Sequence, residues 1–326
     1  MMNTLLIDSA VELTEEEAGG HSGRWAVIDD DVSELMQHWL GLAISQATVV
    51  PVGLAEQTVL EQLISEGEPK GLALLYADSE QSAGSGMLSL IHVKTDTQTQ
   101  KTSNEFWSAY PFFKEGNEIV AQIDALQLFP HRLEAWLTLS LVHNRGVQMT
   151  VFDPLFWAHR SLYRAHHQYH FSVAAMAYEL IPVTDEEIII DDPEKIRQFN
   201  ARRAWVEHSG SWTPANEEAS LAAWQTQAEE DNEPIHISLA TMTALFSVKS
   251  SDDAEFQGAI ITITPRATSI LECYFWRIDT LVIRNDEDFI LPIYVAERLF
   301  TDEWRPEVGQ YVKGSVWLQA YAVGCV

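Results

Sequence analysis

Histidine is the residue type whose clustering first suggests chemistry in this sequence. Six of the eleven histidines fall within forty residues: His131, His143, His159, His166, His167 and His170. Imidazole nitrogens bind metals and transfer protons near neutral pH, so a metal site with Asp153 as an added ligand is one interpretation. Arg160 and Arg164 lie among these histidines and would repel a cation, and no metal-binding motif accompanies them. We therefore expect a surface loop rich in His and Arg, with no bound metal.

Hydrolysis is the second chemistry that this histidine cluster allows. It requires His159, His166 or His170 to meet a carboxylate within hydrogen-bonding reach in a pocket. The sequence contains no G-x-S-x-G motif, and Cys273 lies in an alternating apolar run that is typical of a core strand. The Gly84–Gly86 turn lacks the Lys-Ser/Thr of a phosphate-binding loop. We expect a protein without catalytic activity and without a cofactor.

A third set of candidates combines aromatic side chains with basic neighbours. Proteins that bind single strands stack bases on exposed aromatic rings within a basic groove. The candidate ligand-binding residues are Trp157, Arg160, Tyr169, Arg298, Trp304, Tyr311, Lys313, Trp317 and Tyr321. Large aromatic residues also dominate core energetics, and we favour packing as the role of most of them.

These aromatic residues belong to two nearly neutral stretches that resemble each other. A short apolar strand opens each of the stretches 151–180 and 290–323, and aromatic and basic residues come after it. Both stretches contain Gln-Tyr, at Gln168–Tyr169 and Gln310–Tyr311. Both end a strand with Ala-Tyr. This agreement in order and spacing predicts an internal duplication. Each block of about 65 residues holds four or five short strands, which predicts a small antiparallel barrel of the OB type, with an SH3-like barrel as the rival.

The last predicted strand has the clearest pattern in the chain. Small apolar residues alternate with aromatic and polar ones from Tyr311 to Ala322. A period of two predicts a strand with one buried face. The other face, which carries Trp317 and Tyr321, is expected either to contact solvent or to dock on another part of the chain.

Charge divides the chain into four predicted domains. Residues 1–116 and 183–256 carry net charges of −13 and −11, whereas residues 117–182 and 257–326 carry −1 and −3. Because sharp changes of charge often follow domain boundaries, we predict an acidic α/β domain over 1–116 and two OB-like barrels over 117–182 and 257–326. The acidic segment 183–256 lies between the barrels. The predicted fold class is α+β and rich in β-structure.

The acidic segments carry signals for helices and strands. Asp192 as N-cap and Pro193 predict a helix that ends near His208. A second helix over 217–229 would complete a helical hairpin, and 236–248 is either a third short helix or a strand. In the N-terminal segment we expect helices over 32–44 and 55–64, buried strands over 71–76 and 87–93, and a mobile connection over 95–104.

The charge balance favours a binding function. The chain has 20 Lys+Arg and 48 Asp+Glu, a formal net charge of −28, which argues against a broad surface for duplex DNA or acidic membranes. We expect a non-catalytic cytoplasmic protein whose acidic segments bind a basic protein partner, with the barrels as scaffold. The alternative is a barrel pair that binds single-stranded nucleic acid or oligosaccharide. No apolar run is long enough for a membrane helix, and the N-terminus lacks a basic signal-peptide start.

Overall fold

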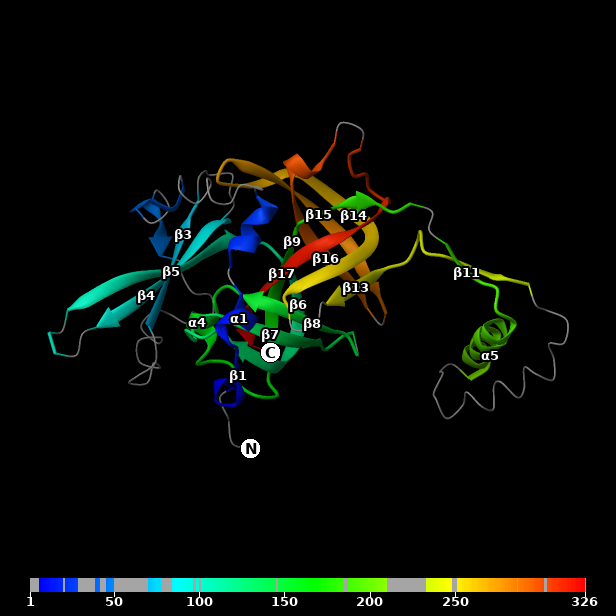
Figure 1. Cartoon of the computed structure of the whole chain (residues 1–326), viewed down its shortest axis with the longest axis horizontal. Coiled ribbons are helices and arrows are strands. Elements are labelled where there is room, and N and C mark those ends of the chain that lie inside the picture. Colours follow the sequence, from blue (N-terminus) through cyan, green and yellow to red (C-terminus); the bar gives the residue numbers. More distant parts are fainter. Residues whose placement is uncertain are drawn as a thin grey trace. The chain divides into compact units, whose positions relative to one another are not determined.

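The chain is divided into two units in its computed structural model (Figure 1). One unit comprises residues 1–182 and 243–326, and the other comprises residues 183–242. The structure describes residues 6–19, 21–28, 39–41, 45–49, 70–77, 84–95, 98–99, 101–144, 146–184, 187–209, 233–247, 251–285, 287–301 and 304–325. The domain boundaries at 116, 182 and 256 were predicted from changes in charge and composition. The division into two units does not test them, so they stay predictions.

Strands dominate the described part of the first unit, and eleven of them belong to one mixed sheet. They are β1 (Val11–Glu12), β6 (Asn117–Leu128), β7 (Ala135–Leu141), β8 (Gln148–Asp153), β9 (Gln168–Ala177), β10 (Ile181–Pro182), β13 (Ala244–Ser247), β14 (Asp253–Ile270), β15 (Cys273–Arg284), β16 (Asp288–Ala296) and β17 (Tyr311–Cys325). The helices of this unit that the structure describes fully are short: η1 (Leu6–Ser9), α1 (Glu15–Ala18), η2 (His21–Val27), α4 (Phe156–His159) and η4 (Glu297–Leu299).

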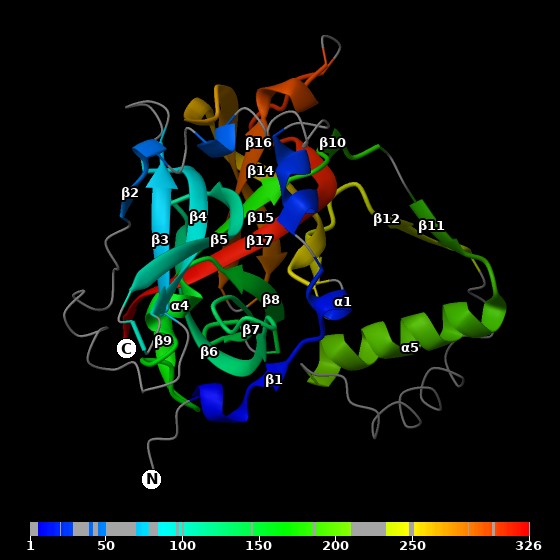
Figure 2. The same cartoon turned by 60° about the vertical axis from the view of Figure 1, so that its left-hand side comes forward.

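The pairing of these strands closes the large sheet on itself twice. Strands β6, β7 and β8 pair in antiparallel order, β8 meets β17, β17 pairs with β9, and β9 returns to β6. Strands β14, β15 and β16 follow the same scheme: β16 meets β9, and β14 returns to β17. The antiparallel pair β9–β17 is therefore common to both rings. Figure 2 shows β17, in red, passing among the strands of both series.

The prediction of two small antiparallel OB-like barrels is wrong. The last strand of each series pairs with the third strand of the other series: Gln319 lies opposite Phe152 and Ile293 lies opposite Ala175, both in parallel ladders. These two parallel ladders join the two antiparallel series, so the strands of both series belong to one mixed sheet. The two series share their order of pairing, but the predicted duplication itself stays a prediction.

Both faces of β17 are buried in its central part, Val316–Ala320. The small apolar face follows the predicted alternation, with Val312, Val316 and Leu318 fully buried in one core cluster. Trp317 on the other face is equally buried and lies in a second cluster with Tyr110 and Phe152, its ring centroid 5.6 Å from that of Phe152. This face was expected either to contact solvent or to dock on another part of the chain, and at Trp317 the structure shows docking.

Tyr110, whose ring contacts that of Trp317 edge-on at 6.4 Å, comes from a second, antiparallel sheet. Its strands are β2 (Thr48–Val49), β3 (Lys70–Tyr76), β4 (Gly86–Thr95) and β5 (Thr102–Phe112). The strands predicted over 71–76 and 87–93 are confirmed by β3 and β4. Residues 102–104, expected in a mobile connection, begin β5 instead. The predicted helix over 55–64 and most of that over 32–44 lie outside the described residues.

The second unit contains a two-stranded antiparallel ribbon and a helix. The ribbon pairs β11 (Glu187–Ile190) with β12 (Ile235–Ser238), and the helix is α5 (Pro193–Ser209). Asp192 caps the helix, because its carboxylate accepts the backbone N–H groups of Glu194 and Lys195 at 2.9 and 3.1 Å. The first helix of the predicted hairpin is thus confirmed, whereas the second, over 217–229, lies outside the described residues. The stretch 236–248 contains strands β12 and β13.

Candidate functional site

Three of the predicted aromatic ligand-binding residues lie in the interior. Trp157, Tyr169 and Trp317 are 8%, 1% and 0% exposed. The hydroxyl of Tyr169 accepts the backbone N–H of Arg164 and donates to the carbonyl of Leu162. Binding of a single strand required these rings to face solvent together with Tyr321. Their burial removes the stacking surface on which that hypothesis depended.

Three of the other six predicted ligand-binding residues donate hydrogen bonds to backbone carbonyls. The guanidinium of Arg160 donates to the carbonyl of Arg132 at 3.1 Å, and that of Arg298 donates to the carbonyl of Ile28 at 2.7 Å. The hydroxyl of Tyr321 donates to the carbonyl of Lys114 at 2.6 Å. Three more are half-buried: Trp304, Tyr311 and Lys313. The contacts at 160, 298 and 321 join segments of the first unit, so their evident role is structural.

The six clustered histidines are dispersed among different environments. His159 is fully buried, His166 and His167 are exposed, and His131 lies beside the buried carboxylate of Glu134. The remaining two, His143 and His170, line a pocket. Within the part of the chain that the structure describes, no three His, Cys, Asp or Glu side chains gather to hold a metal ion.

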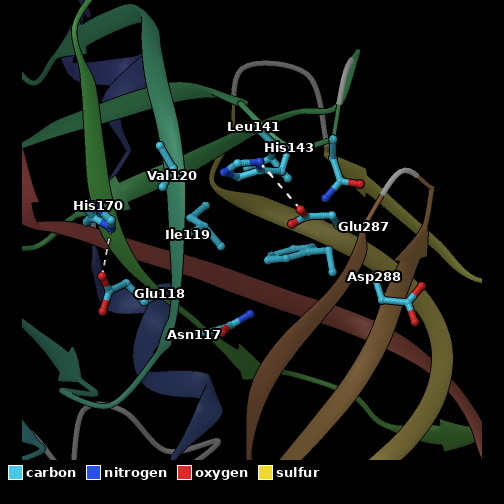
Figure 3. A pocket seen from close by; sticks show the side chains of 11 residues that line it. Asn117, Glu118, Ile119, Val120, Leu141, His143, His170, Glu287 and Asp288 are labelled. Atoms are coloured by element: carbon cyan, nitrogen blue, oxygen red, sulfur yellow. Dashed lines mark ion pairs between the residues drawn. The ribbon is translucent and has the colours of Figure 1, made fainter. Parts of the chain in front are cut away.

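The pocket of His143 and His170 is the candidate functional site (Figure 3). It has a volume of about 350 Å³, at the small end of the range of ligand sites. Its described lining residues are Asn117, Glu118, Ile119, Val120, Leu141, His143, Asn144, His170, Glu287, Asp288 and Phe289. We call it the turn pocket, because the turn between β7 and β8 and the turn between β15 and β16 both contribute to it.

The strand ladder positions one histidine–carboxylate pair of the turn pocket. His170 on β9 lies opposite Val120 on β6. Glu118 is two residues from Val120 and therefore points to the same face of the strand. The Nδ1 atom of His170 lies 2.9 Å from Oε1 of Glu118. A dashed line marks this pair in Figure 3. This pair lies at the pocket wall with both side chains partly accessible to solvent.

Two hairpin turns position the second pair. His143 follows β7 and Glu287 precedes β16, and the Nδ1 atom of His143 lies 3.8 Å from Oε1 of Glu287 (Figure 3). The side chain of Asn117 donates to the carbonyl of Ile290 at 2.8 Å and ties the start of β6 to β16. These contacts bring together residues that are far apart in the sequence.

The chemistry available in the turn pocket is proton transfer and the binding of cations. The pair His170–Glu118 has the arrangement that a hydrolase would need, a histidine bonded to a carboxylate in a pocket. However, the described lining residues include no Ser, Thr, Cys, Tyr or Lys, so the nucleophiles that they offer are limited to carboxylates and imidazoles. The same residues include three carboxylates and no Lys or Arg, which favours a positively charged ligand.

A third histidine–carboxylate pair lies away from the turn pocket. Glu134 is buried between two partners: Ser108 donates to Oε1 at 2.7 Å, and Nε2 of His131 lies 2.7 Å from Oε2. The Nδ1 atom of His131 accepts the backbone N–H of Leu133, so Nε2 carries the proton toward Glu134. Because the carboxylate separates the serine from the histidine, His131 cannot take the proton of Ser108. This group is a structural link between β5 and the turn before β7.

Two buried titratable groups lie near α4. Burial raises the pKa of Asp153 to about 7, although hydrogen bonds from the hydroxyl of Tyr163 at 2.6 Å and from the backbone of Leu155 at 2.9 Å oppose the shift. Burial also lowers the pKa of His159 to about 4, and neither nitrogen of its ring has a hydrogen-bond partner. Both groups are fully enclosed by the core, so a ligand in solution does not reach them.

No protein-family model matches the chain, and no similar chain was found among the curated proteins or among the solved structures. Within the described residues, no helix combines the length and apolar composition that crossing a membrane requires. Any assignment of function therefore depends on the residues themselves.

Proposed function

We propose that the protein is a non-catalytic interaction protein whose acidic segments bind a basic protein partner. The observation that carries the proposal is the ordered acidic segment 6–19, which we call the acidic strap. It presents five exposed carboxylates and contains no Lys or Arg. These residues are Asp8, Glu12, Glu15, Glu16 and Glu17.

The acidic strap is held in a defined conformation. Its strand β1 pairs with the end of β6, and the backbone N–H of Leu13 donates to the carbonyl of Leu128 at 2.8 Å. Thr14 and Glu17 form a capping box at the start of α1, in which each side chain accepts the backbone N–H of the other residue. A segment whose backbone is already ordered loses little backbone entropy on binding, which supports recognition of a basic surface.

The test compares capture of proteins by two variants that lose the same charge. In Glu15→Gln/Glu16→Gln the substitutions fall on exposed residues of the strap, and neither residue forms an ion pair with a described part of the chain. The matched control, Glu179→Gln/Glu307→Gln, changes two exposed carboxylates elsewhere. We expect a basic protein to be captured by the wild type at low salt and released at ~0.5 M salt, where exposed charges are screened. Capture should fall several-fold in the strap variant and stay unchanged in the control.

Two results would contradict this proposal. One is capture that persists at high salt, because attraction between exposed charges would then not hold the complex. The other is equal capture by the strap variant and the control, because the strap would then contribute nothing specific. Nucleic acid that co-purifies in place of a basic protein would point to a different class of partner.

A second candidate function is acid–base catalysis in the turn pocket, and the specific observation that favours it is the 2.9 Å contact between His170 and Glu118. A water molecule activated by this pair would attack an ester, amide or phosphoester without a protein nucleophile. Hydrolysis of a substrate panel by the wild type, abolished in His170→Gln, would support it. Equal rates for both proteins would exclude this pair as the catalyst.

A further inference from the structure

The turn pocket and the acidic strap occupy opposite ends of one strand. The strap pairs with β6 at Gln127 and Leu128, whereas the pocket is lined by Asn117 to Val120 at the start of the same strand. At roughly 3.4 Å per residue, the two sites are about 24–37 Å apart along the strand. The turn pocket is thus a separate site, and the proposed role of the strap does not account for it.

The charges in the turn pocket favour a cation. Glu118 and Glu287 keep 64% and 65% of their side-chain surface exposed, and Asp288 lies next to Glu287. Among the described residues, the neighbouring charged or titratable groups are His143 and His170, together with Arg284, which lies opposite Asp288 across the β15–β16 ladder. Among the described residues, these three carboxylates outnumber the one arginine.

A second observation indicates that the ligand donates hydrogen bonds. Asn144 lines the turn pocket, is only 5% exposed, and its buried side-chain oxygen accepts no hydrogen bond. Leaving a buried acceptor without a donor costs about 1–3 kcal/mol. A ligand with N–H groups would supply the missing donor and would also bond to the carboxylates.

The rest of the lining is apolar. Leu141 and Phe289 are 7% and 3% exposed, and Ile119 is half-buried beside them. A ligand that places hydrocarbon against these side chains and a charged head near the carboxylates matches both parts of the pocket. An arginine side chain has this form, and its guanidinium presents five N–H donors in a plane.

We propose that the turn pocket binds an arginine side chain of a polypeptide, with its guanidinium between Glu118 and Glu287 and one N–H directed to the side-chain oxygen of Asn144. The choice of a polypeptide as the source of the guanidinium rests on the proposed binding of a basic protein. The site itself does not depend on the strap, because the two are at opposite ends of β6.

The test uses short peptides and isothermal titration calorimetry on the full chain. The probe is Ac-Gly-Gly-Arg-Gly-Gly-NH₂, and the matched control peptide carries citrulline, which has nearly the same shape without the charge. We expect saturable binding of the arginine peptide and at least tenfold weaker binding of the citrulline peptide. The pocket variant Glu118→Gln/Glu287→Gln should weaken binding of the arginine peptide at least tenfold. Glu179→Gln/Glu307→Gln, outside both sites, should leave it unchanged.

Several outcomes would overturn the proposal. Absence of binding by the arginine peptide, or equal binding by wild type and pocket variant, would exclude the site. Spermine that binds more tightly than the peptide would identify a free polyamine as the source of the cation. Unchanged thermal unfolding of the pocket variant rules out misfolding as the cause of a loss. A negative result with the arginine peptide would not contradict the proposed role of the acidic strap, because capture of the basic partner is measured separately with Glu15→Gln/Glu16→Gln.

Discussion

The indole N–H of Trp317 donates a hydrogen bond to the carboxylate of Asp252 in the interior of the first unit. The same carboxylate receives the guanidinium of Arg24, which also contacts Asp253 and the hydroxyl of Tyr178. Burial raises the pKa of Asp252, while the charge of Arg24 acts in the opposite direction. One buried carboxylate therefore links the η2 segment to the last strand of the sheet.

Removal of this carboxylate should destabilise the first unit strongly. Asp252→Ala leaves the guanidinium of Arg24 and the indole N–H of Trp317 without their shared partner, and loss of one member of a buried ion pair costs about 3–5 kcal/mol. Urea unfolding should show this loss. Glu105→Ala, which breaks the exposed pair with Lys94, is the control and should change the unfolding midpoint little. Equal midpoints for the two variants would contradict the assigned role of Asp252.

The raised pKa of Asp153 predicts a pH-dependent stability. An acid whose pKa rises from 3.8 to about 7 on folding favours the folded state most below pH 4, and this contribution is lost as the pH rises through 7. Asp153→Asn resembles the protonated form at every pH. We expect the variant to be more stable than the wild type by about 1.6 kcal/mol at pH 5 and by about 4 kcal/mol at pH 8.

Urea unfolding at pH 5 and pH 8 measures this difference for Asp153. Tyr163→Phe is the companion variant, because it removes the hydroxyl that donates to the carboxylate. It should destabilise the protein more at pH 8 than at pH 5. A difference between wild type and Asp153→Asn that is the same at both pH values would show that Asp153 keeps its ordinary pKa.

His159 predicts the opposite dependence on pH. Its pKa falls from 6.5 to about 4 on folding, so its contribution to stability is present above pH 6.5 and is lost as the pH falls through 4. His159→Leu removes two unpartnered nitrogens from the core and should stabilise the protein, by about 2 kcal/mol more at pH 5 than at pH 8. His167→Leu, at an exposed position, should give no such gain in the same unfolding experiment. A destabilised Leu variant at pH 5 would contradict the prediction.

Close approach of two backbones explains a glycine in β17. A Cβ atom at Gly314 would lie 2.0 Å from the carbonyl oxygen of Glu179, whereas one at Gly23 would meet nothing within 4 Å. Gly314→Ala should therefore reduce the free energy of unfolding by about 2–3 kcal/mol, and Gly23→Ala by no more than about 0.5 kcal/mol. Thermal unfolding of the two variants distinguishes them. Similar melting temperatures would show that the chain shifts easily at Gly314.

Local signals in the sequence predicted individual elements well. The N-cap of α5 at Asp192 and the alternation over β17 are both confirmed, because capping and strand periodicity depend on neighbouring residues. The closure of the sheet could not be predicted in the same way. The parallel contact between Phe152 and Gln319 depends on residues that no local pattern connects.

The candidate site was predicted only in part. His143 and His170 were recognised as histidines capable of chemistry, but their carboxylate partners were not, because Glu118 and Glu287 come from other strands and turns. A signal was available: the turns after His143 and before Asp288 occupy matching places in the two similar stretches. The prediction of Trp317 as a ligand-binding residue was wrong, because Tyr110 of β5 packs against its ring. Alternation along a strand indicates that the strand has two different faces, but it does not indicate what packs on the second face.

The position of β17 in both rings has a consequence for synthesis of the protein. This strand is made after every other strand that it joins, yet it pairs with β8, β9, β10 and β14. While the ribosome is still translating residues 311–325, both rings lack β17. The ladder edges of β9 and β14 that pair with β17 are then without their partner strand. The first unit therefore completes its fold after translation of β17, and the nascent chain before that point is a natural client for a chaperone that protects strand edges.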